Sequence, residues 1–429
     1  MTQATTPSKP KSGLVAALDV GTTKVCCLIA RPNVDRGAYG EAGPRIVGIG
    51  HHEARGLRGG NVIDMAEAET AIRAAVETAE QMAGENISEV VVNLSGGKPR
   101  SRLLAYEVAI GGHEIGDSDL RRVLESGTQN NVQAGDDDRE VLHRIPVGYT
   151  VDGNRGVNDP RGMFGQRLGV NVHLIDAQAG PLRNLRTAVE RCHLEVADIM
   201  VTPYAAARGA LVDDEVQLGV TIVDMGGGAT SVAVFFDGEI VHTEVVPVGG
   251  VHVTNDIARG LSTSLQHAER MKTLYGSCLP SASDDQEIIQ VPLVGEDAEN
   301  SVVPVPRSML VGIIRPRIEE TLEMVRQRLE AAGFDKVAGR RVVLTGGACQ
   351  LNGVAEFANR LLDKQVRIGR PRPMDGLAEV TAGPAFSAAA GLLLQACQGP
   401  QVTAQTIYRP AERSGGRLER LGQWLRENF

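Results

Sequence analysis

The sequence predicts an α/β protein in which two related mixed-sheet domains hold one ligand between them. The main observation is a short Asp-x-Gly turn that occurs twice, at residues 19–24 (Asp-Val-Gly-Thr-Thr-Lys) and 224–230 (Asp-Met-Gly-Gly-Gly-Ala-Thr). Each turn lies between two apolar, β-branched runs, which are residues 14–18 and 25–30 for the first copy and 218–223 and 231–236 for the second. Both patterns predict a strand, a tight glycine-rich turn and a returning strand. Two such hairpins predict a duplicated domain whose turns clamp one ligand from opposite sides.

The chemistry of these turns indicates a phosphate ligand. Glycine lets the backbone approach a ligand closely and points successive N–H groups towards an anion. Threonine hydroxyls add donors, and a lysine adds a point charge for phosphate. The residues predicted to bind the phosphates are Gly21, Thr22, Thr23, Lys24, Gly226, Gly227, Gly228 and Thr230.

The aspartate of each turn predicts a metal ion beside the phosphates. Asp19 and Asp224 would repel a phosphate that approached them directly. A Mg²⁺ ion with its water molecules, placed between the carboxylates and the phosphates, removes that conflict. Neither turn has the spacing of a Walker A loop. Each returns as a strand and does not open a helix, which distinguishes it from a dinucleotide-binding turn.

A third glycine turn predicts the place of a nucleoside. Gly346 and Gly347 follow the apolar run 342–345, and the segment after them, residues 353–362, has a helical pattern. A glycine pair at a strand end lets a flat base and a ribose lie against the backbone, where a side chain would clash. Two phosphate turns followed by this turn predict a bound nucleotide.

These three elements resemble the actin, sugar-kinase and heat-shock-chaperone superfamily of ATP-binding folds. Within it the chain resembles the FtsA family of bacterial actin-like cell-division proteins, and the resemblance covers nearly the whole chain. Further matching stretches are residues 190–194, 246–250 and, most specifically, 416–429. The resemblance implies an actin-like ATPase fold with an inserted small subdomain, and ATP with Mg²⁺ as ligands.

The resemblance also implies residues for the nucleoside and for hydrolysis. Glu269 and Lys272, in a helical stretch, would face the ribose and base; a solvated charged face is the alternative for this pair. In actin relatives a Gln or Glu positions the attacking water just before a Pro-x-Ala-Ala helix. Here Thr202 occupies that place. Because a hydroxyl orders water but is a poor base, we predict tight Mg-ATP binding and slow hydrolysis.

The last residues predict a helix that lies on a membrane surface. An apolar stripe that includes a tryptophan and has cationic flanks is typical of interfacial helices. The stripe would consist of Leu418, Leu421, Trp424, Leu425 and Phe429, flanked by Arg417, Arg420 and Arg426. Basic residues near anionic lipid contribute roughly 1 kcal/mol each. A terminal helix packed on its own core is the alternative. The linker composition of the preceding residues favours the membrane helix.

Composition limits the remaining possibilities. The chain has 429 residues, a formal net charge of −9 and six cysteines, none in a Cys-x-x-Cys pair. This length can bury two cores. The acidic balance argues against general nucleic-acid binding, and the cysteines are those of a reduced, cytoplasmic protein. No apolar run is long enough to span a bilayer.

The expected domain organisation follows from the motifs and the resemblance. The first ATPase half takes residues 13–83 and 164–210 and is interrupted by an inserted small subdomain at 84–163. The second half takes 211–245 and 311–395, with a small lobe at 246–310. This half includes a helix at 315–332 and a closing helix at 378–394 that packs tightly on the first half. Outside these parts we expect a disordered N-terminus at 1–12, a flexible linker at 396–415 and the membrane helix at 416–429.

Partners are implied by the resemblance as well. In the FtsA family the small lobe receives the C-terminal peptide of the tubulin-like FtsZ, and the inserted subdomain contacts neighbouring subunits and later division proteins. In this chain the apolar run 309–314 lies between Arg307, Arg315 and Arg317, which would suit a short acidic-apolar peptide. The expectation is therefore a filament-forming peripheral protein on the cytoplasmic side of the inner membrane, at the division site.

Two alternatives share the same fold. A small-molecule kinase would need an aspartate base. The sequence nominates none, although Asp176 and Asp198 lie at plausible strand-adjacent positions. A PilM-like pilus-assembly adaptor would bind a peptide but would lack the terminal amphipathic helix. The tail distinguishes both from a division protein.

Overall fold

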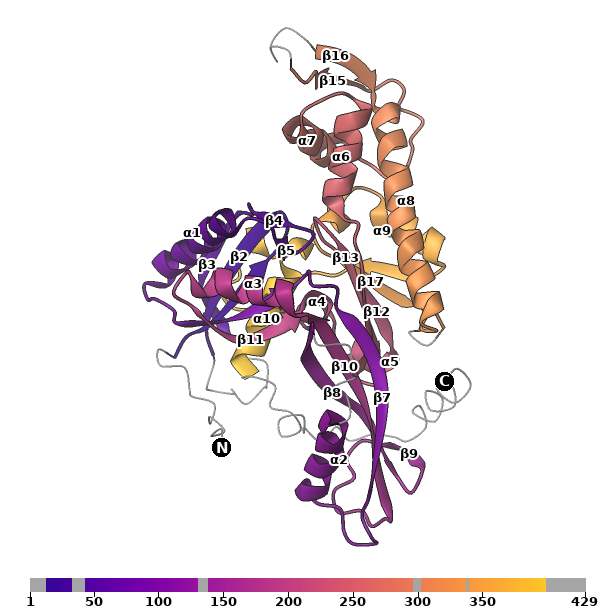
Figure 1. The fold of residues 1–429 in the computed structure, drawn as a ribbon. Coiled ribbons are helices and arrows are strands. Elements are labelled where there is room, and N and C mark those ends of the chain that lie inside the picture. The colour runs from indigo at the N-terminus through magenta and orange to yellow at the C-terminus, as the bar shows by residue number, and fades with distance from the viewer. Residues whose placement is uncertain (1–12, 33–42, 130–137, 296–301, 337–338, 399–429) are drawn as a thin grey trace.

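Two five-stranded sheets with the same topology form the centre of the molecule (Figure 1). The computed structural model describes residues 13–32, 43–129, 138–295, 302–336 and 339–398. In each sheet an antiparallel hairpin pairs with a third antiparallel strand on one side and with two parallel strands on the other. The first sheet has the order β11 (Glu195–Val201), β6 (Glu89–Leu94), β1 (Val15–Val20), β2 (Lys24–Arg31), β3 (Arg45–Glu53). The predicted duplication is confirmed.

The second sheet repeats this arrangement strand for strand. The first strand of its hairpin pairs in parallel with the next strand of the sheet. The second strand of the hairpin pairs antiparallel with a strand at the sheet edge. Its order is β14 (Glu239–Val246), β13 (Thr230–Phe236), β12 (Val220–Met225), β17 (Arg341–Thr345), β18 (Gln365–Ile368). The central strands are buried on both faces, which explains why their sequences are continuous apolar runs.

Helices cover both faces of the first sheet. The helix α1 (Met65–Ala83) packs on β2 and β3 through a stripe of small and apolar residues. Its start is fixed by Asp64, whose carboxylate accepts hydrogen bonds from two backbone N–H groups of the first turn, and it ends at Gly84 in the left-handed conformation. The other helices of this half are α3 (Ala179–Glu190) and α4 (Thr202–Ala210).

An inserted subdomain projects from the first half, at the bottom of Figure 1. Its sheet has the strand order β7-β10-β8-β9, and one helix covers a small separate core. The elements are β7 (Arg100–Ala109), α2 (Asp117–Gln129), β8 (Arg139–Val151), β9 (Asn154–Val157) and β10 (Arg167–Gln178).

The boundaries of this insertion differ from those expected, 84–163. The strand β6 belongs to the first sheet, because it pairs in parallel with β1. The strand β10, expected in the first half, pairs with both β7 and β8 and so belongs to the insertion. These pairings join residues far apart in sequence, so the local pattern does not reveal them.

The small lobe lies at the opposite end of the molecule, at the top of Figure 1. Its long helix α8 begins at Arg307, eight residues before the expected start at residue 315, and passes through Pro316. Proline normally marks a first turn. Here Leu310, Val311 and Ile314, which precede it, are buried in the core and keep the earlier turns helical. The lobe contains α6 (Gly250–Gly260), α7 (Leu265–Tyr275), β15 (Ile288–Pro292), β16 (Val302–Pro306) and α8 (Arg307–Ala331).

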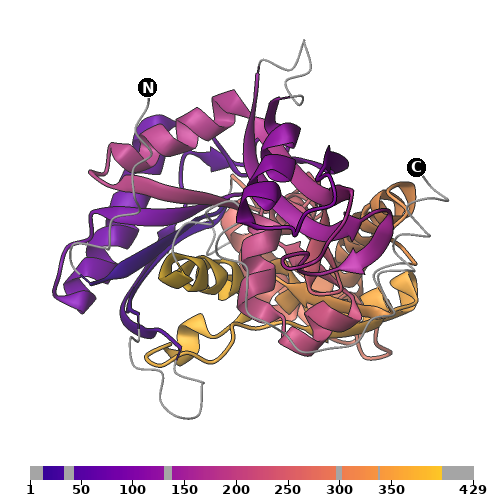
Figure 2. The ribbon, with the colours of Figure 1, turned by 90° about the horizontal axis from the view of Figure 1, so that it is seen from below.

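The closing helix α10 (Ser387–Gln398) begins nine residues later than expected. Two short 3₁₀ turns, Glu379–Thr381 and Pro384–Phe386, occupy the segment before it. As predicted, this helix packs tightly on the first half, beside the indigo strands of Figure 2. A Cβ atom on Gly391 would overlap the carbonyl oxygen of Ala205 on α4, so the small residues are needed for this packing.

The remaining elements connect these parts. They are β4 (Leu57–Arg58), β5 (Asn61–Val62), α5 (Asp213–Leu218), a 3₁₀ turn (Ala348–Gln350) and α9 (Val354–Leu362). The predicted N-terminal segment, the linker beyond residue 398 and the membrane helix lie outside the described residues.

Three buried histidines lie where the inserted subdomain meets the two halves. His173 is fully buried and bonds to Ser101 Oγ at 2.7 Å, and His242 stacks on Phe334 with ring centroids 4.8 Å apart. His143 accepts a hydrogen bond from the backbone N–H of Val201 at 3.1 Å. Burial lowers the pKa of His143 and His242 to about 4 and that of His173 to about 3. All three are therefore neutral in the folded protein at neutral pH.

We expect His242→Gln to gain stability relative to the wild type as the pH falls from 7.5 to 5. The unfolded chain protonates this histidine below about pH 6.5, whereas the folded chain does not until about pH 4, so the wild type loses stability in this window. The difference at pH 5 is roughly 2 kcal/mol. Burial also raises the pKa of Glu239 and of Asp224 to about 7, so these two carboxyl groups increase the total stability as the pH falls. The comparison between variants is therefore more informative than the stability of either protein alone.

Denaturant unfolding of both proteins across this pH range measures the effect. The exposed His52 provides the matched control, because His52→Gln should follow the wild type at every pH. A constant difference between His242→Gln and the wild type would show that His242 is not held neutral.

Candidate functional site

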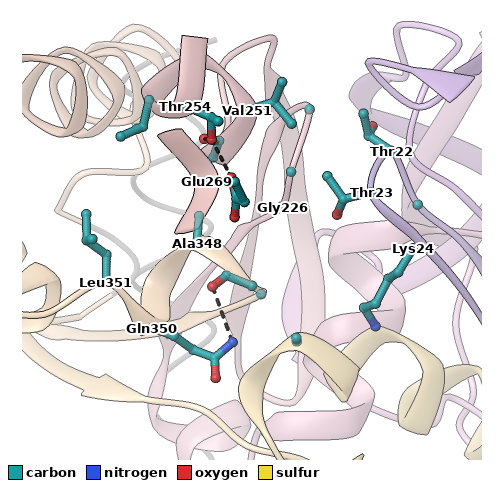
Figure 3. Close-up of a pocket in the computed structure, with 18 of the residues that line it drawn as sticks. Thr22, Thr23, Lys24, Gly226, Val251, Thr254, Glu269, Ala348, Gln350 and Leu351 are labelled. Atoms are coloured by element: carbon teal, nitrogen blue, oxygen red, sulfur yellow. Dashed lines mark hydrogen bonds between the residues drawn. The ribbon is translucent and has the colours of Figure 1, made fainter. Parts of the chain in front are cut away.

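A cleft of about 1200 Å³ opens between the two halves (Figure 3). The first turn joins β1 to β2, and the second joins β12 to β13, so duplication of the hairpin places both at the cleft. Each turn is closed by a backbone hydrogen bond of 3.0 Å, from Gly21 N to Lys24 O and from Gly226 N to Ala229 O.

The two turns touch each other across the cleft. A Cβ atom on Gly228 would overlap the hydroxyl of Thr22, and one on Gly227 would overlap the side chain of Thr23. Figure 3 shows Thr22 and Thr23 facing the Gly226 turn. The glycines therefore let the backbones of the two turns approach each other, as a clamp on one anion requires.

Most of the predicted site residues line this cleft. The third turn joins the other two there because β17 is parallel to β12 and ends at the same edge of the sheet. The lining includes Asp19, Gly21, Thr22, Thr23, Lys24, Thr202, Asp224, Gly226, Gly227, Gly228, Glu269, Lys272, Gly346 and Gly347.

The predicted role of Thr230 is corrected by its position. This residue is fully buried, and its hydroxyl donates to the carbonyl oxygen of Val248 at 2.8 Å. Because side chains alternate along a strand, the next residue, Ser231, reaches the cleft instead. Thr230 holds the second turn to the start of the small lobe.

The two aspartates give the cleft its electrostatic character. Burial raises the pKa of Asp19, and burial together with the charge of Asp19 raises the pKa of Asp224 to about 7. Lys24 Nζ lies 3.6 Å from Asp19 Oδ2 and 3.9 Å from the centre of the Phe386 ring. This ammonium has no hydrogen-bond partner among the described residues. Two crowded carboxylates and one cation with unused donors fit a divalent ion beside a phosphate.

Thr202 is the first residue of α4, at the end of the cleft that holds Asp19. Its hydroxyl lies 2.8 Å from Ser95 Oγ and accepts a hydrogen bond of 3.1 Å from the amide of Asn93. Sequence reasoning missed Ser95 and Asn93. The available signal was a polar residue, Asn93, inside the continuous apolar run of β6.

The residues expected near the nucleoside form one hydrogen-bonded group. Lys272 Nζ donates to Glu269 Oε2 at 2.7 Å and to Thr254 Oγ1 at 2.9 Å, and Thr254 donates to Glu269 at 2.5 Å. Figure 3 shows Glu269 and Thr254 above Ala348 and Gln350. Opposite them, Gly346 has φ +86°, and a Cβ atom there would clash with Asp224 and the carbonyl oxygen of Met225. Only glycine suits this turn.

Comparisons with known proteins agree with this geometry. Residues 221–391 match the family described as "Cell division protein FtsA", and residues 96–176 match "SHS2 domain inserted in FTSA". Cell division protein FtsA of Rhizobium meliloti is 43% identical over 99% of this chain and 96% of its own length. The Pseudomonas aeruginosa and Escherichia coli K12 proteins of that name are 35% and 33% identical, over 97% of this chain and 98% of theirs.

The chain belongs to the FtsA family. It is thereby a member of a family of cell division proteins. The matched insertion, 96–176, agrees with the observed sheet from β7 to β10 and not with the expected boundaries.

Solved structures show the same fold with little sequence identity. The PilM–PilN type IV pilus biogenesis complex aligns with a TM-score of 0.63 at 17% identity, covering 89% of this chain and 98% of that one. MreB5 of Spiroplasma citri bound to ADP aligns with a TM-score of 0.52 at 14% identity, covering 89% and 95%. These likenesses confirm the actin-like fold. Full-length identity to FtsA proteins disfavours the pilus-adaptor and kinase alternatives.

The two candidate bases of a kinase also lie away from the cleft lining. Asp176 is buried in the inserted subdomain, where Arg100, Arg102 and Arg139 all pair with it. Asp198 is on β11, and burial raises its pKa. Neither contributes to the lining.

The arginines expected to bind a partner peptide have other roles in the structure. Arg307 donates to Asp284 at 2.5 Å and to the carbonyl oxygen of Tyr275 at 2.8 Å, and it also lines the cleft. Arg317 pairs with Asp256, also at 2.5 Å. Arg315 is exposed and lies over the Phe357 ring. In the apolar run between them, Leu310, Val311 and Ile314 are buried, whereas Met309 is exposed. The role of this run in peptide binding stays a prediction.

A different apolar surface is exposed on the small lobe. Leu274, Tyr275, Ile288 and Met309 have 59%, 38%, 52% and 49% of their surfaces exposed. Arg307 connects them. Its side chain donates to the carbonyl oxygen of Tyr275, its backbone N–H donates to the carbonyl oxygen of Glu287 beside Ile288, and it precedes Met309 by two residues. We call these four residues the small-lobe patch. Sequence reasoning missed it because three elements contribute to it.

Within the described residues, no helix combines the length and apolar character needed to cross a membrane. The same residues contain no group of three or more His, Cys, Asp or Glu side chains placed to hold a metal ion.

We expect Asp224→Asn to make the protein more stable in the absence of nucleotide and metal, and to abolish Mg-ATP binding. The substitution keeps the shape but removes a buried charge beside Asp19, which should stabilise the folded state by up to about 4 kcal/mol at pH 8. Thermal unfolding and titration with a fluorescent ATP analogue measure the two effects. The exposed Asp285→Asn is the control and should change neither. Wild-type Mg-ATP affinity in Asp224→Asn would exclude Asp224 from the metal site.

Proposed function

We propose that this protein is an ATP-binding, actin-like division protein that polymerises on the inner face of the cytoplasmic membrane and attaches FtsZ filaments to it. The observation that carries the nucleotide part is the contact of two glycine turns around two buried carboxylates and an unbonded ammonium. Each turn alone would be an ordinary hairpin. Together they supply donors from opposite sides and a place for Mg²⁺, which suits the phosphates of ATP.

Hydrolysis should be slow because the water-positioning place has no strong base. Thr202, Ser95 and Asn93 meet there, and none of their side chains takes up a proton near neutral pH. They can order a water molecule but contribute little to its activation. ATP would then act as a structural ligand and an assembly signal.

The membrane part of the proposal rests on the sequence of residues 416–429. A single helix of this size with three flanking arginines binds anionic lipid reversibly. A filament would present many such helices to one surface, so polymerisation multiplies membrane affinity without any new contact. Attachment of this kind makes the protein peripheral.

The small-lobe patch is the best-supported place for the FtsZ peptide. Its exposed apolar side chains offer the anchor that a short peptide needs, and Arg315 remains exposed for an acidic residue. The inserted subdomain, at the far end of the molecule, would meet later division proteins and the neighbouring subunit.

We expect the full chain with Mg-ATP to form filaments on anionic lipid monolayers, and a chain truncated after Ser414 to form none there. Electron microscopy of both proteins, with and without Mg-ATP, tests the proposal. Trp424→Glu is a milder variant and should reduce lipid binding without affecting the folded core. Dispersed particles for the full chain under all conditions would contradict the polymerising role, and equal lipid binding by the truncated chain would contradict the tail anchor.

We expect Met309→Glu to weaken binding of a peptide from the FtsZ C-terminus by at least about tenfold. The substitution places a charge in the small-lobe patch, where it would be desolvated by the peptide and would repel its acidic residues. Fluorescence anisotropy with a labelled peptide measures the affinity. Met82→Glu is the matched control, because Met82 is similarly exposed but lies on α1. Equal losses in the two variants would place the peptide elsewhere.

A further inference from the structure

Asn93 is a fully buried polar residue that joins three parts of the phosphate end of the cleft. It is at the end of β6, behind the cleft lining. Its side chain bonds to β1 through Val20 N and Asp19 Oδ1, both at 2.6 Å. The same NH₂ group lies 3.1 Å from Ser95 Oγ and from Thr202 Oγ1, and its two hydrogens are shared among these two oxygens and Asp19 Oδ1. A buried amide is costly unless it is hydrogen-bonded, and here every polar atom of it is used.

The orientation of this amide is fixed by its partners. The backbone N–H of Val20 can only donate, so the oxygen of Asn93 must face it. The NH₂ group then faces Asp19 and the two hydroxyls, all of which can accept. The reversed amide would place two donors against each other and leave its oxygen facing a carboxylate. The hydrogen-bond network therefore allows one arrangement.

This arrangement fixes the rotation of the Asp19 carboxylate. One oxygen, Oδ1, is bonded to the amide, and the other, Oδ2, lies on the side of Lys24. Asp19 itself lines the cleft. Because one oxygen of this carboxylate is held by a hydrogen bond, the second oxygen stays directed towards the proposed ion site. A freely rotating carboxylate would lose conformational entropy when it bound the ion.

The same amide prepares the Ser95–Thr202 pair. Because both hydroxyl oxygens accept from Asn93 and lie 2.8 Å apart, one hydroxyl donates to the other. One O–H group and the remaining lone pairs are left for the cleft, which both residues line. Two hydroxyls at hydrogen-bond distance from each other can hold one water molecule between them.

We propose that Asn93 is a positioning residue that sets Asp19 for Mg²⁺ and the Ser95–Thr202 pair for the attacking water. Asn93 does not touch the ligand and acts through these residues. The inference rests on the proposed binding of ATP. It adds the residue that connects the metal end of the site to the water end.

The experiment compares Asn93→Leu, Ser95→Ala and Thr202→Val with the wild type. Leucine has the branched outline of asparagine, with the same number of side-chain heavy atoms, but no hydrogen-bond donor or acceptor, and valine has the shape of threonine. The matched control is Thr321→Val, which removes a buried hydroxyl bonded within α8, away from the cleft. For each protein we measure the Kd of ATP with Mg²⁺ and with EDTA, the single-turnover hydrolysis rate, and the Tm.

The expected results separate the two roles. Asn93→Leu should bind Mg-ATP about tenfold more weakly, a change of about 1.4 kcal/mol. Its affinity for ATP in EDTA should stay within about twofold of the wild type. Ser95→Ala and Thr202→Val should keep the wild-type Kd within about twofold and lose at least about tenfold in single-turnover rate. Thr321→Val should change neither quantity.

The opposite results are equally clear. If Asn93→Leu folds and its affinity for ATP increases with Mg²⁺ as much as that of the wild type, the proposed positioning of Asp19 would be overturned. Wild-type rates in Ser95→Ala and Thr202→Val would overturn the role of the hydroxyls. If Asn93→Leu does not fold, Asn93→Ser, whose hydroxyl is too short to reach Asp19, should show the same loss. A wild-type protein that binds no ATP would overturn the proposed function as well, whereas normal wild-type binding with unchanged variants overturns only this inference.

Discussion

The burial of Asp19 and Asp224 in one cleft is the constraint on which the site depends. Burial raises the pKa of both carboxyl groups, the charge of Asp19 raises that of Asp224 further, and Lys24 alone does not balance them. The folded protein therefore carries a local instability that the proposed divalent cation and phosphate would remove. Because each aspartate lies at the end of the first strand of a hairpin, duplication of one sheet topology places the two carboxylates in the same cleft.

The rest of the site holds those two carboxylates in place. Asn93 ties Asp19 to α4, and Gly346 lets the third turn pass against Asp224 without a side chain. The closing segment connects the halves, because Thr345 Oγ1 donates to Ser387 Oγ at 2.7 Å while Lys24 lies over Phe386. The contacts of this closing segment join the two duplicated halves. The geometry of the site and the packing of the halves therefore depend on each other.

Local patterns predicted the parts of this structure that local chemistry determines. The hairpins, their turns and the helix after Gly347 follow from strand periodicity and glycine placement within a few residues. The errors have non-local causes. The insertion boundaries depend on which strand pairs with which, and α8 begins early because its first turns are buried. Ser95 and Asn93 meet Thr202 only after β6 and α4 are brought together, so no short motif contains all three.

The helices of the small lobe connect the cleft to the small-lobe patch. On α7, Glu269, Lys272 and Leu274 line the cleft, and Leu274 together with Tyr275 belongs to the small-lobe patch. Arg307 lines the cleft and bonds to Tyr275, and Met309 follows one half-turn later on α8. A ligand shifts an equilibrium only by the difference in its contacts between two states. Under the proposed function, a movement of α7 against α8 would change the contacts of both the nucleotide and the peptide, and Arg307 would couple the two binding events.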